Sequence, residues 1–282
     1  MTQSAGPRSV EPFFLEGEAG QRFCLFHPPA GAACQGAVLY VHPFADEMNK
    51  SRRMAALQAR ALSALGFGVL QIDLHGCGDS SGDFCDARWD TWKRDLALAH
   101  FWLSERLGLP VHLWGLRLGA LLALDYSAVA TEPVAALLLW QPVLSGKVFL
   151  TQFLRLRVAN AMLSDDKAAA TGTAALRARL AAGETLEIAG YGLAPALAAA
   201  IDALDLAKMA PAACPVHWFE AVSAADRPLP PGAARVHAAW VDAGYSLYTH
   251  VLACPPFWAA QEIAECPALL GATTAVFSSG LS

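Results

Sequence analysis

The chain has 282 residues, of which 55% are hydrophobic and 16% are charged, and its formal net charge is −5. This length suits one large α/β domain with an insertion better than two small domains. A nucleic-acid partner is not expected, because there is no basic stripe with interleaved aromatic residues. A membrane span is not expected either, since charged residues and a proline interrupt the best apolar run, 116–140.

The first eleven residues are polar and lack the apolar core of a signal peptide, so we expect a cytoplasmic protein. The seven cysteines are scattered and form no Cys-x-x-Cys pair. This pattern predicts mostly buried thiols in a reducing compartment rather than a zinc site or a disulfide framework. We expect neither a metal nor a cofactor.

Strands and helices alternate along the first half of the chain. A loose tail at 1–9 precedes two short apolar runs, 13–15 and 22–27, which predict an antiparallel hairpin. Buried strands are then predicted at 36–41, 68–73, 111–114 and 135–140, and helices at 51–65 (with Ser51 as its N-cap), 89–107 and 118–129. Such alternation predicts a mostly parallel sheet with right-handed crossovers.

The pattern changes after residue 144. Residues 145–210 are rich in alanine and helical spacing, with a polar run at 164–167, and predict a helical cap inserted into the core. The core, which begins with 1–144, resumes in 211–282. There we predict strands at 216–219 and 245–251 and helices at 231–243 and 257–264.

The most informative segment is 112–120, which combines a short apolar strand, a tight turn between Gly115 and Gly119, and a helix. This is the layout of the Gly-x-Ser-x-Gly nucleophile elbow, and it predicts an α/β-hydrolase fold. The position of the serine nucleophile holds Arg117. A guanidinium group stays protonated and has no lone pair with which to attack a carbonyl.

The catalytic base is missing as well. In this fold the triad follows the order serine, acid, histidine. Glu220 and Asp226 follow the predicted strand 216–219 and are candidates for the acid, but the stretch 251–258 contains no histidine. His250 lies inside the last strand, where a structural role is expected. Removing either the nucleophile or the base typically costs on the order of a millionfold in turnover.

The loop after the first buried strand contains a His-Pro turn that starts at His42. In α/β-hydrolases an N–H group of this loop completes the oxyanion hole. Because proline has no N–H, the donor is expected to be Phe44 or Ala45, together with the amide of Leu118 from the elbow.

The loop 73–82 has the pattern Asp-x-x-Gly-x-Gly-x-Ser-x-Gly. A structural role is favoured, because the glycines permit the turn while the aspartate and serine fix it. The alternative is a displaced nucleophile at Ser80 or Cys77; neither has an evident base, although His75 is close in sequence.

The polar segment 47–53 precedes the first predicted helix. It is either a solvated charge run or an anion site shared with Arg117, since arginine and helix N-terminal amides suit a carboxylate or phosphate. In the second case the ligand-binding group would be Arg117, Leu118, His42, Phe44, Asn49 and Lys50.

Taken together, the segments 42–53, 73–82 and 114–119 resemble the exosortase A system-associated hydrolase 2 family, and 140–147 and 256–258 fit as well. The resemblance covers most of the chain. It implies an α/β-hydrolase fold and a bacterial exopolysaccharide and PEP-CTERM sorting system.

Two functions fit these observations. The first is an ester or thioester hydrolase with a non-standard site, in which Ser80, Cys77 or an activated water attacks and Arg117 stabilises the developing anion. The second is a non-catalytic protein that uses the cleft, the cap and Arg117 to bind an anionic or acyl-type ligand, or a protein partner of an exopolysaccharide pathway. The missing nucleophile and base favour the second.

Overall fold

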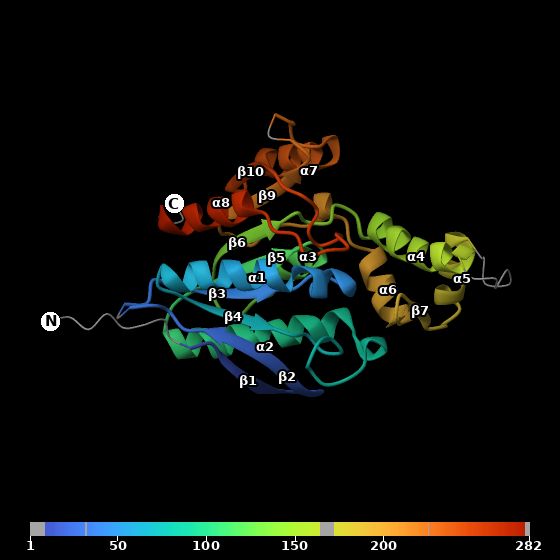
Figure 1. Cartoon of the computed structure of the whole chain (residues 1–282), viewed down its shortest axis with the longest axis horizontal. Helices are drawn as coiled ribbons and strands as arrows, with labels where there is room; N and C mark the ends of the chain where they lie inside the picture. Colours follow the sequence, from blue (N-terminus) through green and yellow to red (C-terminus); the bar gives the residue numbers. More distant parts are fainter. Residues whose placement is uncertain (1–8, 32, 164–171, 225, 280–282) are drawn as a thin grey trace.

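The computed structural model describes residues 9–31, 33–163, 172–224 and 226–279 (Figure 1). The predicted polar run 164–167 and most of the predicted tail 1–9 lie outside this part of the chain. Within the described residues, no helix has both the length and the apolar character needed to cross a bilayer.

The core is an eight-stranded sheet in the order β1-β2-β4-β3-β5-β6-β9-β10. β1 (Glu11–Gly17) and β2 (Gly20–His27) form the predicted antiparallel hairpin, and β2 pairs antiparallel with β4. All other neighbours pair parallel, so the predicted mostly parallel sheet is confirmed. The parallel strands are β3 (Gly36–Val41), β4 (Phe67–Ile72), β5 (Val111–Leu116), β6 (Val134–Trp140), β9 (Val216–Val222) and β10 (Leu247–Ala253).

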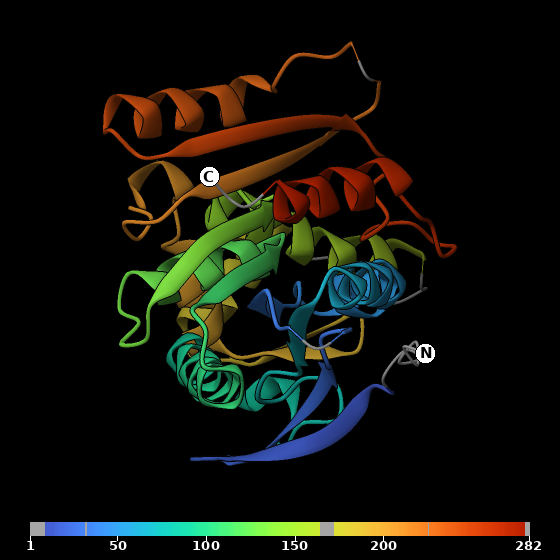
Figure 2. The ribbon, with the colours of Figure 1, turned by 90° about the vertical axis from the view of Figure 1, so that its left-hand side faces the viewer.

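Helices cover both faces of the sheet (Figure 2). α1 (Asp46–Ala64) and α8 (Pro267–Ser278) bury one face, whereas α2 (Trp89–Leu107), α3 (Leu118–Ser127) and α7 (Pro231–Asp242) bury the other. Successive strand residues point to opposite faces: Trp114 packs on the α1 side and Leu113 on the α3 side. Burial on both faces explains why the central strands are continuous apolar runs.

The chain between β6 and β9 forms a group of elements that we call the cap. It consists of α4 (Gly146–Leu163), α5 (Thr173–Ala181), β7 (Leu186–Ile188), β8 (Tyr191–Leu193), α6 (Pro195–Asp202) and the 3₁₀ turn η3 (Leu206–Lys208). The cap lies on the right of Figure 1, beside the start of α1.

Tyr191 ties the cap to the core. Its hydroxyl accepts a hydrogen bond from Asn49 Nδ2 at 3.2 Å, and its ring packs edge-on against Phe84 in the 3₁₀ turn η1 (Phe84–Asp86). The cap therefore contacts both α1 and the loop after β4. Its exact limits as a separate unit stay a prediction.

The start of α1 differs from the sequence prediction. The predicted N-cap at Ser51 is wrong: the helix begins at Asp46, and Ser51 is buried within it. Ala45, at φ +50°, turns the chain directly from the His42 loop into the helix. Asp46 and Glu47 then suit the positive end of the helix dipole. The polar segment 47–53 is thus helix rather than the loop before it.

The predicted closing helix at 257–264 is also wrong. These residues form turns, in which Phe257 and Trp258 are buried, so their apolar character reflects tertiary packing. The last helix, α8, begins at Pro267, whose fixed φ suits the first helical position. The β7–β8 hairpin has no counterpart in the sequence prediction.

Cys254 and Cys266 are joined by a disulfide that closes the loop after β10. For these two residues the prediction of free thiols is therefore wrong. The five other cysteines are free, and Cys24 and Cys77 are buried. No spacing rule in the sequence pairs two cysteines twelve residues apart; the chain brings them together at the start of α8.

A buried ion pair joins the hairpin to the rest of the core. Arg22 Nε of β2 lies 2.6 Å from Asp95 Oδ1 of α2, and the two side chains are 1% and 4% exposed. Asp95 Oδ2 accepts a second hydrogen bond from the backbone N–H of His75 at 2.8 Å. Burial raises the pKa of Asp95, and Arg22 and the His75 amide oppose that rise.

We predict that Asp95→Ala lowers the free energy of unfolding by about 3–5 kcal/mol, because it leaves the buried guanidinium of Arg22 without a counter-ion. Urea unfolding at pH 7 measures the loss. The control is Glu18→Gln, which breaks the exposed Glu18–Arg94 pair and should cost less than about 1 kcal/mol. Equal losses in the two variants would contradict the assignment.

Candidate functional site

The turn between β5 and α3 places Arg117 at the top of the sheet. Its backbone has φ +57° and ψ −118°, a strained conformation for a residue with a side chain. The Arg117 N–H donates to the carbonyl of Trp140 at 2.9 Å, and its carbonyl accepts from the Ala120 N–H at 3.2 Å. This sharp turn directs the side chain outward from the carboxyl end of the strand.

The two glycines of the turn are required by close packing. A Cβ atom at Gly115 would collide with the backbone of Ala120. A Cβ atom at Gly119 would collide with the carbonyl groups of Val41 and His42, where α3 passes against the end of β3. The elbow and the His42 loop therefore lie in direct contact, as oxyanion-type geometry requires.

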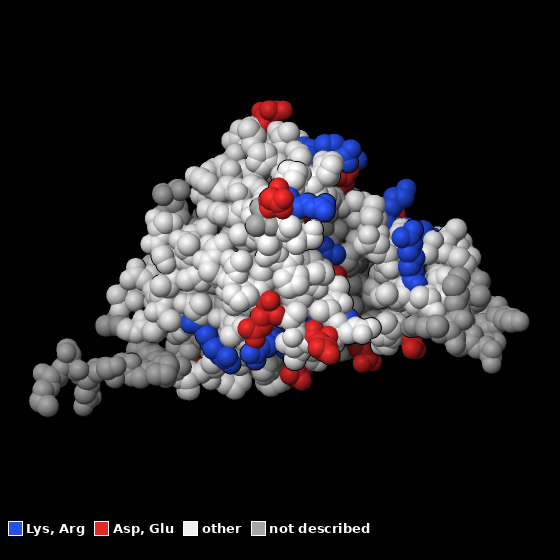
Figure 3. Space-filling model, turned by 45° about the horizontal axis from the view of Figure 1, so that its top comes forward, with Lys and Arg blue, Asp and Glu red and all other residues white. Residues whose placement is uncertain are grey.

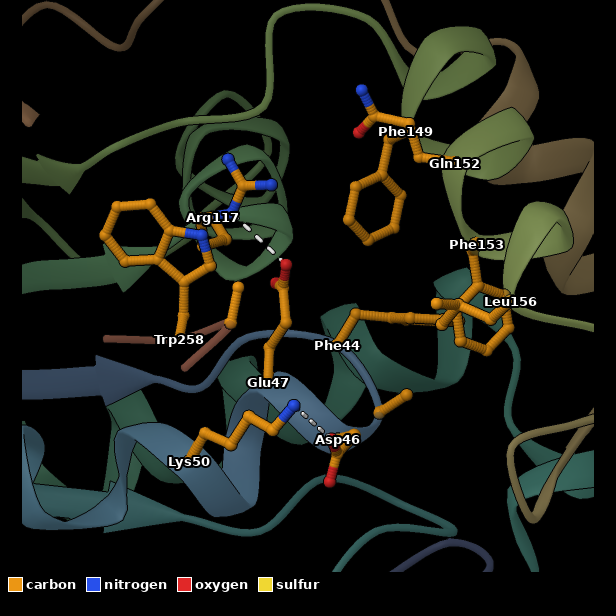
Figure 4. A pocket seen from close by; sticks show the side chains of 12 residues that line it. Phe44, Asp46, Glu47, Lys50, Arg117, Phe149, Gln152, Phe153, Leu156 and Trp258 are labelled. Carbon is orange, nitrogen blue, oxygen red and sulfur yellow. Dashed lines mark hydrogen bonds and ion pairs between the residues drawn. The ribbon is translucent and has the colours of Figure 1, made fainter. Parts of the chain in front are cut away.

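The guanidinium of Arg117 lies between a carboxylate and an aromatic ring (Figure 4). Its Nε is 3.3 Å from Glu47 Oε1, and its Cζ is 5.3 Å from the ring centre of Trp258. The side chains of Arg117 and Glu47 are 17% and 21% exposed. The two terminal nitrogens point away from Glu47. This arrangement fixes the cation while leaving its forked end for another partner.

Arg117 lines two pockets. The first, of about 320 Å³, lies between the first turn of α1, helix α4 of the cap and the loop after β10. Its walls are mostly apolar, and its charged residues are balanced in sign. The apolar walls include Phe44, Phe149, Phe153, Leu156 and Trp258, and the charged residues are Asp46, Glu47, Lys50 and Arg117. Figure 3 shows a hollow between core and cap with side chains of both charges on its floor.

The second pocket, of about 390 Å³, is more polar. It shares Arg117, Phe149 and Gln152 with the first pocket, so the two form adjoining compartments of one cleft. The other polar residues of the second pocket are Gln141, Ser145, Glu220 and Arg235.

Glu47 has an unusual environment for a carboxylate. Burial raises its pKa, and the charge and hydrogen bond of Arg117 oppose the rise. Its second oxygen, Oε2, is buried without a hydrogen-bond partner among the described residues. Among the described residues, Arg117 Nε is the one side-chain hydrogen-bond donor to this carboxylate.

The remaining predicted ligand-binding residues surround the elbow. His42 is buried: its Nδ1–H donates to the Pro43 carbonyl at 2.8 Å, and its Nε2 accepts from the Leu74 N–H at 3.2 Å. Burial lowers the pKa of His42, and the two hydrogen bonds of its ring hold the loop in place. The ring of Phe44 lines the first pocket, and Leu118 begins α3, where N–H groups lack intrahelical partners.

Asn49 and Lys50 lie in the first two turns of α1. Asn49 donates to Tyr191 of the cap and does not line either pocket, whereas Lys50 lines the first pocket. The Nζ of Lys50 is 2.8 Å from Asp46 Oδ2. Of the two, only Lys50 is therefore placed near a ligand in this cleft.

The alternative nucleophiles of the 73–82 loop are held elsewhere. The Ser80 hydroxyl donates to the Asp73 carbonyl and accepts from the Phe23 N–H at 2.9 Å. Cys77 is buried, and burial raises the pKa of its thiol. Neither residue lines either pocket of the cleft, nor does His75. These hydrogen bonds serve the loop that joins β4 to α2.

Glu220 is in β9 rather than after it. Its carboxylate is buried and accepts hydrogen bonds from Trp218 Nε1 at 2.8 Å and Gln141 Nε2 at 3.0 Å. Burial raises its pKa. Glu220 lines the second pocket, but Asp226 is exposed and lines neither.

No histidine lines the cleft, although His42 lies beside the elbow. His250 stacks on Phe219 and is paired with His217 Nδ1 at 3.3 Å. All eight histidines lie in the described part of the chain, and none lines either pocket. The loop after β10, where the triad histidine is expected, contributes Trp258 and Ala259 instead.

Several residues that line the cleft were not in the predicted ligand-binding group: Glu47, Gln141, Phe149, Gln152, Phe153, Leu156, Arg235 and Trp258. Glu220 also lines the cleft, but it was predicted only as a candidate acid. Trp258 could have been found, because it lies in the 256–258 segment that carried the family resemblance. The cap residues had no local signal, since only the folded chain shows which face of α4 meets the elbow.

The sheet order, the crossovers and the elbow define an α/β-hydrolase fold. The family model described as serine aminopeptidase, S33 matches residues 32–179, more than half of the chain, and the chain belongs to this family. Over 129 residues it is 31% identical to the human protein ABHD12B. That match covers 44% of this chain and 34% of the relative, so the chain matches about a third of the relative's length.

Solved structures show the same fold at low sequence identity. A soluble variant of monoglyceride lipase from Saccharomyces cerevisiae has a TM-score of 0.64 at 15% identity, with 96% of each chain covered. Est1E from Butyrivibrio proteoclasticus, bound to ferulic acid, has a TM-score of 0.64 at 13% identity, covering 95% and 97%. An α/β serine hydrolase without lid from Xanthomonas campestris has a TM-score of 0.56 at 16% identity, covering 98% and 94%.

The buried histidines predict sensitivity to acid. Burial lowers the pKa of His217 to about 4, with a further contribution from His250. An unfolded histidine, with a pKa near 6.5, takes up a proton that folded His217 does not bind, so the free energy of unfolding falls as the pH drops from about 6.5 to 4. We predict that His217→Gln reduces this fall by on the order of 1–2 kcal/mol.

Urea unfolding of both proteins between pH 4 and 8 measures the effect. The two curves should be parallel above pH 7, where His217 is neutral in both states. Identical slopes for wild type and His217→Gln between pH 6.5 and 4 would contradict the prediction.

Proposed function

We propose that this chain binds a small anionic molecule with an apolar part through Arg117, and that it does not act as a serine hydrolase. The observation that carries the proposal is the position of the Arg117 guanidinium. It occupies the elbow, where the fold otherwise presents its nucleophile, and its free terminal nitrogens lie in a cleft lined by no histidine.

The chemistry of the surrounding residues argues against serine-type hydrolysis. That reaction needs a hydroxyl nucleophile and a base that accepts its proton. Arg117 supplies neither. The Glu220 carboxylate is held by Trp218 and Gln141, and the Ser80 hydroxyl is held by Asp73 and Phe23. The one serine that lines the cleft among the described residues is Ser145, whose hydroxyl accepts from the Val148 N–H at 3.4 Å, and no histidine lines the cleft to act as its base.

The same residues suit recognition of an anion. A planar guanidinium binds a carboxylate or phosphate through two parallel N–H bonds. Contact with Trp258 and with Glu47 holds that plane in place before a ligand arrives. The aromatic walls of the first pocket offer an apolar surface for the remainder of the molecule, and its volume is within the range of small-molecule sites.

The cellular setting is proposed from the sequence resemblance alone. The likeness of 42–53 and 73–82 to the exosortase A system-associated hydrolase 2 family supports a role beside bacterial exopolysaccharide synthesis. A protein partner of that pathway is an alternative occupant of the cleft. Recovery of a pathway protein that competes with a small anion for the cleft would favour this alternative.

The proposed function is tested with octyl sulfonate, which has an apolar tail and a charge that does not titrate. We predict that Arg117→Ala weakens its binding at least tenfold, because charge-assisted hydrogen bonds to the head group are lost. Isothermal titration calorimetry measures the dissociation constant. The control is Arg60→Ala, which removes an exposed arginine of α1 outside both pockets.

Labelling with a fluorophosphonate and with iodoacetamide provides the opposing test. The proposal expects no stoichiometric adduct on a serine or cysteine of the cleft, and no efficient esterase in Arg117→Ser, because the base is still missing. An adduct that abolishes ester turnover would overturn it.

The raised pKa of Glu47 leads to a prediction of how ligand binding depends on pH. Its raised pKa means that it takes up a proton more readily than an ordinary glutamate as the pH falls, after which Arg117 has no charged partner in the first pocket. Octyl sulfonate should therefore bind more tightly at pH 5 than at pH 8. Glu47→Gln should bind it several-fold more tightly than wild type at pH 8 and lose most of the pH dependence.

The control for this change is Glu105→Gln, an exposed glutamate of α2 that lies outside both pockets. It should leave both the affinity and its pH dependence unaltered. The role of Glu47 is contradicted when Glu47→Gln keeps the wild-type pH profile.

A further inference from the structure

The charge distribution of the cleft differs between its two compartments. The charged residues of the first pocket are two acids and two bases, and they form two ion pairs, Arg117–Glu47 and Lys50–Asp46. The second pocket is lined by two arginines, Arg117 and Arg235, against one carboxylate, Glu220. An anion is therefore favoured in the second pocket and an apolar group in the first.

Besides Arg117, the cleft is lined by two cations, Lys50 and Arg235, and these two differ in their partners. Lys50 is paired with Asp46, whereas Arg235, on α7, forms no ion pair or side-chain hydrogen bond with any described residue. The carboxylate of the second pocket is already satisfied, since Glu220 accepts hydrogen bonds from Trp218 and Gln141. Arg235 is exposed and lines the second pocket, so its guanidinium is accessible to a ligand bound there.

Arg117 lies where the two pockets meet, together with Phe149 and Gln152, which also line both. In Figure 4 the ring of Phe149 faces Arg117 across the opening, and the terminal nitrogens of Arg117 point away from α1 and Glu47. A ligand whose acidic head contacts these nitrogens can extend its tail past Phe149 into the first pocket.

We propose that the ligand is a phosphate monoester with an alkyl or aryl tail, whose head is held between Arg117 and Arg235 in the second pocket and whose tail lies in the first. The inference depends on the proposed function, since it assigns the class and direction of the same ligand. A phosphate group carries nearly two charges and three acceptor oxygens, which two guanidinium groups satisfy better than a carboxylate does. Arg235 is the residue that selects between the two head groups.

Calorimetry with octyl phosphate, octanoate and butyl phosphate tests the assignment. Wild type should bind octyl phosphate about tenfold more tightly than octanoate, and octyl phosphate more tightly than butyl phosphate. Arg235→Gln should abolish the preference for phosphate and keep the preference for the longer chain. The matched control, Arg60→Gln, should keep both preferences.

A tail-side variant tests the direction of binding. Leu156 lines the first pocket and is 47% exposed, so Leu156→Gln is compatible with folding. It should reduce the preference for octyl over butyl phosphate and leave the preference for phosphate over carboxylate intact. The opposite pattern, with Arg235→Gln changing chain-length preference and Leu156→Gln changing head-group preference, would overturn the assigned direction.

Comparing Arg117→Ala with Arg235→Gln shows whether a failure concerns this inference alone or the proposed function as well. If Arg117→Ala weakens both octanoate and octyl phosphate but Arg235→Gln behaves like Arg60→Gln, the second-pocket assignment fails while the proposed function stands. If Arg117→Ala leaves binding of all three probes unchanged, or wild type binds none of them, both fail.

Discussion

The arrangement of the site follows from one constraint: a permanently charged side chain is fixed at the tip of the elbow and must be accommodated there. Arg117 cannot lose its proton, and the backbone turn gives its side chain no other direction. The carboxylate of Glu47 and the ring of Trp258 both contact the Arg117 guanidinium and stabilise its charge. Both come from segments that serve catalysis in ordinary members of the fold, the oxyanion loop with its helix and the loop after the last strand.

The arginine at the elbow and the loop after β10 are physically compatible. A histidine in the loop after β10 would place a second basic group beside a guanidinium, whereas Trp258 offers the negative face of its ring. The disulfide between Cys254 and Cys266 closes this same loop, and Phe257 and Trp258 are buried within it. Trp258 in this loop therefore suits a neighbouring cation.

The sequence predicted the framework well and the cleft only in part. Buried strands such as β3 and β5 are continuous apolar runs between turn residues, and the elbow glycines mark the strand–helix junction, so local patterns were enough. The start of α1 was mispredicted because the positive φ of Ala45, which turns the chain into the helix, is set by the loop before it. The last helix was mispredicted because Phe257 and Trp258 are buried by tertiary contacts in a non-helical turn.

The cleft depends on contacts between residues far apart in the chain. Glu47 is 70 positions from Arg117, and Trp258 lies near the other end of the chain. The hydrophobic periodicity of the sequence does not reveal contacts between residues so far apart. The arginine itself was visible in the sequence, and the missing histidine could be inferred from order along the chain. Only the structure shows that Glu47 and Trp258 surround Arg117. Only the structure shows that Arg235 lines a second pocket together with Arg117.

The most direct test of the account is the position of the head group in a crystal structure of the complex with octyl phosphate. The account predicts phosphate oxygens 2.7–3.2 Å from the terminal nitrogens of Arg117, with the alkyl chain against Phe149. A head group bound away from Arg117, or a covalent phosphoryl adduct on another residue of the cleft, would contradict it.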